Sequence, residues 1–139
     1  MKLASIDVGL KRIGVAICLS SDIVLPQTAI LRKNRNQAAS EVSAFLKEWE
    51  IEKLVVGLPL HAKSSAEMER RIKHFVSLLA LTIPVAYQDE QSSSLEAKAL
   101  TQGIFRHKKD GKIDSIAAKI ILERYLVSAS SKEVGSSNK

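Results

Sequence analysis

The chain has 139 residues, of which 45% are hydrophobic and 26% are charged, and this composition favours one globular domain over intrinsic disorder. The formal net charge is +6, so polyanionic partners such as nucleic acid are favoured. No apolar run reaches the roughly 18 residues that a membrane span needs, and the N-terminus lacks the layout of a signal peptide. The single cysteine, Cys18, cannot form an internal disulfide, so a cytoplasmic location without membrane attachment is expected.

Two apolar runs at the N-terminus, residues 2–8 and 13–19, flank a short turn that contains glycine and basic residues. This pattern predicts a β-hairpin with Asp7 close to the end of its first strand. A third extended segment is expected over residues 23–31. Three successive strands with short connections imply an antiparallel meander.

The rest of the chain alternates between helical and extended patterns. The predicted elements are a helix over 37–50, a strand over 53–59, a helix over 64–79, a strand over 85–87, a helix over 93–100 and a final helix from residue 114. Capping-box spacing at Ser64 and Glu67, and again at Ser93 and Glu96, supports two of the helix starts.

Strands that alternate with helices imply parallel crossovers. The predicted fold class is therefore α/β, with one mixed five-stranded sheet that begins as an antiparallel meander, continues through parallel crossovers and is flanked by helices. Residues 1–127 are expected to form a single domain. Residues 128–139 are rich in Ser, Lys and Gly, and they predict a flexible C-terminal tail.

Acidic residues fall at the ends of several predicted elements. Asp7 lies near the end of the first strand, Asp89 and Glu90 follow the last strand, and Asp114 begins the last helix. Small residues after Asp114 would let that helix pack closely on the sheet and bring the carboxylates together. Converging carboxylates repel one another unless divalent cations neutralise them, and oxygen ligands favour Mg²⁺ or Mn²⁺. Spacing alone leaves ordinary roles open, since Asp114 could be a helix N-cap and the Asp89–Glu90 pair could be solvated.

Four motifs resemble those of the YqgF (RuvX) family in order and separation. They are Ile6–Ala16 (IDVGLKRIGVA), Val55–Leu60 (VVGLPL), Asp89–Glu90, and Ile113–Ala118 (IDSIAA) with Ile121–Leu122. The resemblance runs from Lys2 to about Leu126. It implies an RNase H-like fold and a metal-dependent nuclease, because family members are described as Holliday junction resolvases and as nucleases that mature the 5′ end of pre-16S rRNA.

The resemblance also implies roles for the acidic residues. The family's catalytic and metal-binding carboxylates fall on Asp7, Glu90 and Asp114, and Asp89 could support or replace Glu90. A two-metal phosphodiester hydrolase is then expected, in which Asp7 bridges two Mg²⁺ or Mn²⁺ ions about 3.5–4 Å apart. Glu90 and Asp114 would each hold one side of the pair, and no nucleophilic side chain is needed.

Two positions depart from the family pattern. Gln91 stands where the family usually has an arginine, and His61–Ser65 replaces a Gly-containing polar turn. Neither change removes a proposed metal ligand, but both affect substrate positioning. A nucleic-acid-binding module without significant cleavage therefore remains an alternative. An actin-like nucleotide hydrolase, which shares the Asp7-x-Gly9 element, would need a second lobe.

Basic clusters are expected to bind the phosphate backbone. The predicted nucleic-acid contacts are Lys11, Arg12, Arg106, Lys108 and Lys109. The first two flank Asp7, and the others lie in a loop that leads into Asp114. The cluster over residues 32–35 is a further candidate, whereas the cluster over residues 70–74 is expected to be ordinary exposed surface.

The expected partner is structured RNA, with pre-16S rRNA first and a four-way DNA junction second. Junction resolution normally requires two active sites related by symmetry, because two strands are cut. A small chain that acts as a monomer or weak homodimer fits RNA trimming better.

Overall fold

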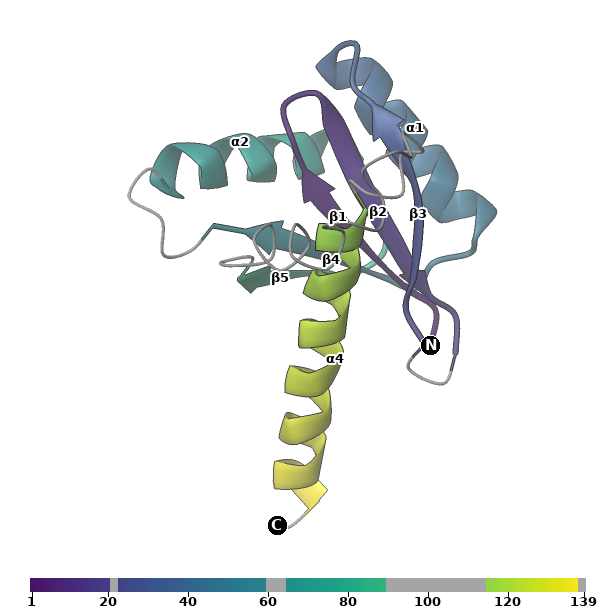
Figure 1. Cartoon of the computed structure of the whole chain (residues 1–139), viewed down its shortest axis with the longest axis vertical. Helices are drawn as coiled ribbons and strands as arrows, with labels where there is room; N and C mark the ends of the chain where they lie inside the picture. The colour runs from purple at the N-terminus through teal and green to yellow at the C-terminus, as the bar shows by residue number, and fades with distance from the viewer. Residues whose placement is uncertain (21–22, 60–64, 90–114, 138–139) are drawn as a thin grey trace, which may run out of the picture.

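A computed structural model of the chain describes residues 1–20, 23–59, 65–89 and 115–137, and these form a mixed five-stranded sheet flanked by helices (Figure 1). The elements are β1 (Leu3–Val8), β2 (Arg12–Cys18), β3 (Leu25–Leu31), α1 (Arg35–Glu48), β4 (Lys53–Leu58), α2 (Ser65–Leu78), β5 (Val85–Asp89) and α4 (Ile116–Ser137). The predicted helix over 93–100 lies outside the described residues. The order of the described elements confirms the predicted α/β fold.

The sheet has the strand order β3-β2-β1-β4-β5. β1 pairs antiparallel with β2, and β2 pairs antiparallel with β3, whereas β4 pairs parallel with both β1 and β5. The meander and the parallel crossovers are therefore both confirmed. Because β1, β4 and β5 run in the same direction, their carboxyl ends meet at one edge of the sheet, which we call the carboxyl edge.

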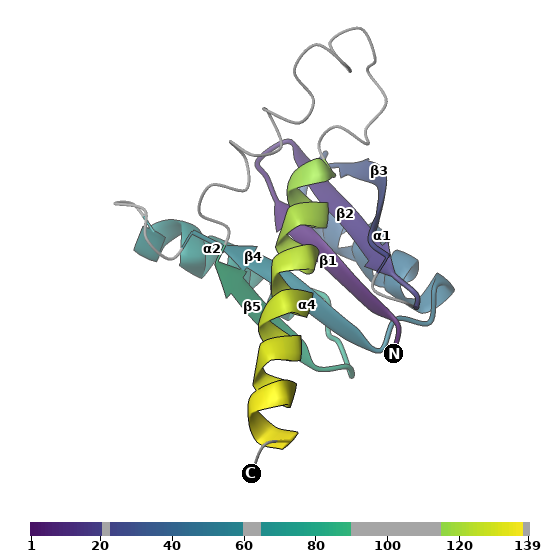
Figure 2. The same ribbon diagram turned by 60° about the horizontal axis from the view of Figure 1, so that its bottom comes forward.

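Helices cover both faces of the sheet, with α4 on one face and α1 and α2 on the other (Figure 2). Each face has its own hydrophobic core. Ile6 and Val56 pack with Phe75 on the face covered by α1 and α2. Val55, which directly precedes Val56 on β4, packs with Ile121 of α4 on the opposite face. Successive strand residues point to opposite faces, so nearly continuous apolar strands are needed when both faces are covered.

Small residues let α4 lie close to the sheet, as the sequence predicts. Ala118 is fully buried, and its carbonyl accepts a 2.6 Å hydrogen bond from the Ser5 hydroxyl of β1. A larger side chain on this stripe would push the helix away from the strand. The contact fixes the distance between α4 and the middle of β1.

Local signals set the ends of α1. Asn34 caps the helix and forms a reciprocal capping box with Gln37.

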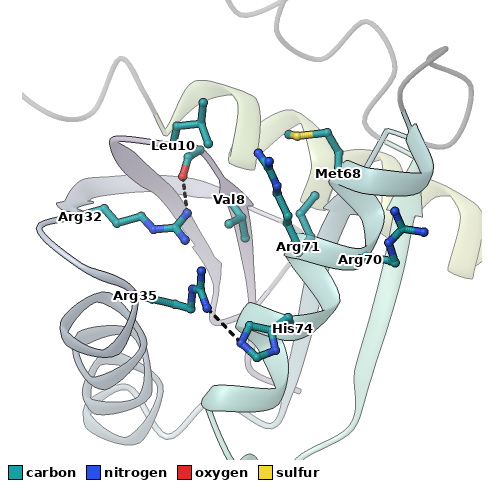
Figure 3. Close-up of a pocket in the computed structure, with 10 residues that line it drawn as sticks. Val8, Leu10, Arg32, Arg35, Met68, Arg70, Arg71 and His74 are labelled. Carbon is teal, nitrogen blue, oxygen red and sulfur yellow. Dashed lines mark hydrogen bonds between the residues drawn. The ribbon is translucent and has the colours of Figure 1, made fainter.

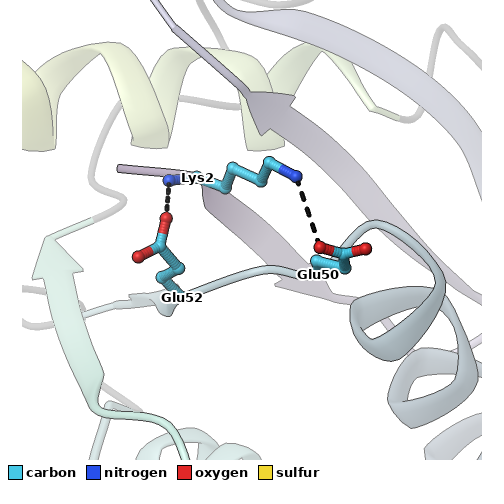
Figure 4. A network of polar contacts seen from close by, with 3 residues as sticks. All are labelled: Lys2, Glu50 and Glu52. Atoms are coloured by element: carbon cyan, nitrogen blue, oxygen red, sulfur yellow. Dashed lines mark hydrogen bonds and ion pairs between the residues drawn. The ribbon is translucent and has the colours of Figure 1, made fainter.

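Polar contacts of Lys2 follow the end of α1 (Figure 4). Glu50, which has φ 54°, places its carboxylate 3.7 Å from the Lys2 ammonium. The Glu52 carboxylate accepts a 2.8 Å hydrogen bond from the Lys2 amide. These contacts tie the start of β1 to the segment before β4, at the end of the sheet opposite the carboxyl edge.

The last helix is longer than composition predicts. α4 continues to Ser137, so the chain from residue 128 to 137 is helical where a frayed tail is expected. A helix that is already started by tertiary packing propagates at low cost, because each further residue adds one hydrogen bond. The domain boundary at residue 127 and the flexibility of residues 128–139 stay predictions. Within the described segments, no helix is long and apolar enough to span a bilayer.

Candidate active site

Asp7 lies near the carboxyl end of β1 and is partly buried. It pairs in register with Gly14 of β2. Strand alternation puts its side chain on the same face as Ser5, which bonds α4. Gly14 has no side chain, so this partner adds no bulk beside the Asp7 carboxylate on the face that α4 covers.

The start of α4 is anchored beside Asp7. The buried hydroxyl of Ser115 accepts a 3.0 Å hydrogen bond from the amide of Val15. The β2–β3 register shifts between Ile13 and Val15, and such irregularities often occur next to active sites. Ile6 pairs with Val15 in the register position next to the pair formed by Asp7 and Gly14. Because Ser115 bonds Val15, the start of α4 lies one residue pair away from Asp7.

Asp89, the second proposed carboxylate that the structure describes, lies on the other face of the sheet. It is the last residue of β5, not the first residue after it, and it pairs with Leu58. Two residues earlier, the Tyr87 ring lies 5.6 Å from the Lys73 ammonium of α2. Alternation therefore directs Asp89 toward the α2 face, whereas Asp7 is directed toward the α4 face.

Of the proposed metal ligands, the structure describes only Asp7 and Asp89. Glu90 and Asp114 lie outside the described residues. Among the residues that are described, no group of three or more His, Cys, Asp or Glu side chains could hold a metal ion. The described residues supply one carboxylate, Asp7, beside the fixed start of the helix that follows Asp114.

The turn between β1 and β2 presents two predicted nucleic-acid contacts. The Gly9 amide donates to the Arg12 carbonyl at 3.0 Å, and a Cβ at Gly9 would lie 2.5 Å from that same oxygen. The glycine of the Asp7-x-Gly9 element is thus required by the turn itself. Lys11 and Arg12 are exposed, and alternation along β2 puts Arg12 on the face of Gly14 and Asp7. Arg106, Lys108 and Lys109 lie outside the described residues.

A basic pocket of about 400 Å³ lies on the opposite face of β1 at the carboxyl edge (Figure 3). Its lining residues come from the end of β1 and the turn that follows it, from the segment that runs from β3 into the start of α1, and from α2: Val8, Gly9, Leu10, Arg32, Arg35, Met68, Arg70, Arg71, Ile72 and His74. We call this the arginine pocket. None of these described lining residues is acidic.

Sequence similarity identifies the family. The family model for RuvX, described as a Holliday junction resolvase, matches residues 1–128. The chain belongs to the RuvX family. A RuvX relative from Sulfurovum sp. (strain NBC37-1) is 79% identical over 126 residues, which cover 91% of this chain and 98% of that protein. Another, from Sulfurimonas denitrificans, is 50% identical over 126 residues and covers 91% and 97% of the two chains. Both carry the name "Putative pre-16S rRNA nuclease".

Solved structures support the fold of this RuvX chain. The structure of T. thermophilus RuvC in complex with a Holliday junction substrate matches with a TM-score of 0.57 at 14% identity, covering 94% of this chain and 96% of that one. The fowlpox virus Holliday junction resolvase matches with a TM-score of 0.51 at 14% identity, covering 93% and 99%. At such low identity the likeness concerns the fold, and it agrees with the predicted RNase H-like architecture.

Sequence reasoning missed two features of this RuvX site. Ser115 was part of a motif, but only the fold shows that its hydroxyl holds α4 against β2. The arginine pocket combines the clusters at 32–35 and 70–74, which are far apart in the chain. The weak signal in the sequence is the positive charge of the two clusters, although the sequence alone favours ordinary exposed surface for the second cluster.

Proposed function

We propose that this RuvX-family chain is a divalent-metal-dependent nuclease that processes the 5′ end of pre-16S rRNA in the cytoplasm. The observation that carries the proposal is the position of Asp7, on the face of β1 where the buried start of α4 is anchored through Ser115. Asp114 immediately precedes Ser115 in the chain. The names of the relatives supply the RNA substrate.

In this proposal Asp7, Glu90 and Asp114 hold the metal. Asp89 would have a supporting role, because alternation along β5 directs its side chain to the face opposite Asp7. Carboxylate oxygens suit Mg²⁺ or Mn²⁺. When bound, two such ions supply the charge that activates water and stabilises the leaving oxygen of a phosphodiester.

We also propose that basic residues of the chain bind and orient the phosphate backbone of the nucleic acid. Lys11 and Arg12 would contact phosphates beside Asp7, and both are exposed on the β1–β2 turn. Arg106, Lys108 and Lys109 would contact phosphates from the segment that leads to Asp114. The formal net charge of +6 favours association with a polyanion.

The second candidate function is resolution of four-way DNA junctions by a weak homodimer. The description of the RuvX family as a Holliday junction resolvase favours it, and RuvC, which shares the fold, is bound to a Holliday junction substrate in its structure. We rank RNA processing first because both of these high-identity relatives carry the RNA name, and because a monomer suffices to trim one strand. A non-catalytic binding module is the third candidate, since Gln91 replaces the family's usual arginine.

The test is cleavage of a labelled pre-16S 5′-leader RNA beside a labelled four-way DNA junction, with Mg²⁺, Mn²⁺ or EDTA. Asp7→Asn is expected to lower the cleavage rate at least about 100-fold, because it removes a metal-binding carboxylate but keeps the side-chain shape. Glu48→Gln is the matched control, since it removes one negative charge at the far end of α1, where the side chain is exposed. Titration of Mn²⁺ binding by calorimetry supplies a readout that does not depend on activity.

Metal-dependent cleavage of the RNA, lost in Asp7→Asn and kept in Glu48→Gln, supports the ribonuclease. Symmetric cleavage of the junction alone would favour the resolvase. Binding of either substrate without cleavage under any metal condition would contradict both enzymes. Unchanged cleavage by Asp7→Asn would overturn the assignment of the site.

A further inference from the structure

We propose that the arginine pocket binds an internal backbone phosphate of the substrate strand, on the face of β1 opposite Asp7, a few nucleotides from the bond that is cleaved. The inference rests on the proposed nuclease function and extends its binding site. It concerns Arg32 and Arg35 from the segment that runs from β3 into the start of α1, and Arg71 from α2. Of these, the sequence offers the cluster over residues 32–35 as a candidate phosphate contact, whereas it favours ordinary surface for Arg71.

The first argument is the convergence of positive charge. Figure 3 shows Arg32, Arg35 and Arg71 extending into the space between the end of β1 and α2. Guanidinium groups that share one cavity repel one another unless an anion lies among them. Since the described lining has no carboxylate, an external anion is the natural counterion. Arginine forks match the geometry of phosphate oxygens.

The second argument is preorganisation. The Arg32 guanidinium donates a 2.8 Å hydrogen bond to the Gly9 carbonyl and lies 5.4 Å from the centre of the buried Phe75 ring. These contacts hold the side chain in place while leaving further guanidinium donors available. Arg35 lies 3.3 Å from Nε2 of His74. Because arginine only donates, this histidine nitrogen accepts, and it orients Arg35 without competing for an anion.

The third argument is that the ion pair formed by Arg71 is weak. Arg71 pairs with Glu67 at 2.6 Å, but their side chains are 59% and 60% exposed. Such an exposed pair contributes little, so Arg71 can exchange Glu67 for a phosphate at small cost. Arg32, Arg35 and Arg71 can therefore bind one anion together.

The fourth argument identifies the anion as part of a nucleic-acid strand. The pocket also has apolar walls, with Val8 and Ile72 buried and Leu10 72% exposed at the tip of the β1–β2 turn. A free inorganic ion makes no favourable contact with apolar walls, whereas a nucleotide carries a sugar and a base whose apolar surfaces can pack against them. The wall residue Val8 directly follows Asp7, so a strand that crosses the carboxyl edge at the turn can reach both faces of β1.

The experiment measures binding of the leader RNA in EDTA by proteins that carry Asp7→Asn. Arg35→Gln is expected to raise the Kd about tenfold, as loss of a charge-assisted hydrogen bond does, and to reduce the salt slope of log K by about 0.7. Lys47→Gln is the matched control, because it removes the same charge from the exposed far end of α1 and is expected to leave the Kd within about twofold. Arg71→Gln is the second variant, and circular dichroism confirms folding.

The phosphate is located with leader RNAs that each carry one neutral methylphosphonate. At one internal position the neutral linkage and Arg35→Gln are expected to be non-additive, since each removes the same contact. Equal, additive effects at every position would overturn the proposal, as would dependence on a 5′-terminal phosphate. If wild type cleaves RNA but Arg35→Gln behaves like Lys47→Gln, the pocket inference fails alone. If the wild-type protein cleaves neither substrate, the proposed function fails. The non-additivity between the methylphosphonate and Arg35→Gln is measured in binding, so it still tests the arginine pocket.

Discussion

At the scale of single residues, the register of β5 directs Asp89 away from Asp7. Asp89 pairs with Leu58, whose side chain lies in the core beneath α1 and α2. Asp7 lies on the face that α4 covers. The sequence leaves open whether Asp89 or Glu90 serves the site, and the register of β5 argues against Asp89 as a ligand shared with Asp7.

We predict that Glu90→Gln abolishes metal-dependent cleavage, with a loss of at least about 100-fold, while Asp89→Asn retains activity within about tenfold. The reason is that Asp89 faces α2 and cannot share a cation with Asp7 on the other face, whereas the family resemblance places a metal ligand on Glu90. Cleavage rates and Mn²⁺ titrations measure both variants. The reverse order of effects would overturn the assignment of Glu90 as the ligand.

At the scale of elements, two serine hydroxyls attach α4 to the sheet in different ways. Ser115 accepts from the buried amide of Val15, whereas Ser5 donates to the carbonyl of Ala118. Loss of the first bond leaves a buried N–H without a partner. Loss of the second leaves a carbonyl that lies within a helix and can still accept a helical hydrogen bond.

We predict that Ser115→Ala lowers the free energy of unfolding by about 1–3 kcal/mol, because the Val15 amide is left buried and unsatisfied. Ser5→Ala is the control and is expected to cost about 0.5–1.5 kcal/mol. Chemical denaturation measures both. Since Ser115 positions the start of α4, cleavage should also fall in Ser115→Ala; a variant of full stability would contradict this role.

The end of α2 offers a second prediction at this scale. Ala80 has φ 49°, a left-handed conformation that costs a non-glycine residue about 1–2 kcal/mol. Ala80→Gly is therefore expected to stabilise the fold by about 0.5–1 kcal/mol, after the entropy that glycine loses on folding.

Ala44→Gly is the matched control, because the same exchange inside α1 at an exposed position should destabilise by about 1 kcal/mol. Thermal melting measures both variants. The same sign for the two changes in stability would contradict the left-handed conformation of Ala80.

At the scale of the whole molecule, α4 projects beyond the sheet (Figure 1). Tyr125 and Leu126 pack on the core, and the next residue, Val127, is 68% exposed. We predict that deleting residues 128–139 leaves the melting temperature within about 3 °C and leaves cleavage unchanged, since the deleted segment follows these core contacts. Sedimentation of both lengths checks for a dimer, and a shift in oligomeric state would assign α4 an interface role.

The sequence by itself determined the class and order of the elements. Alternating and continuous apolar runs set the strands, helical periodicity set α1 and α2, and the ordered motifs pointed to the RuvX family without any knowledge of the fold. These signals are local, because each depends on residues that are neighbours along the chain. The role of Gly9 is also local, since it depends on a turn of a few residues.

Only the tertiary structure decided which distant residues meet. The register between β4 and β5 separated Asp89 from the face of Asp7, and the packing of α4 gave Ser115 its role. The arginine pocket formed because α1 and α2 lie on the same face of the sheet. The sequence of a basic cluster does not specify which distant cluster will lie beside it. The long-range contacts that bury the two cores bring the clusters at 32–35 and 70–74 together.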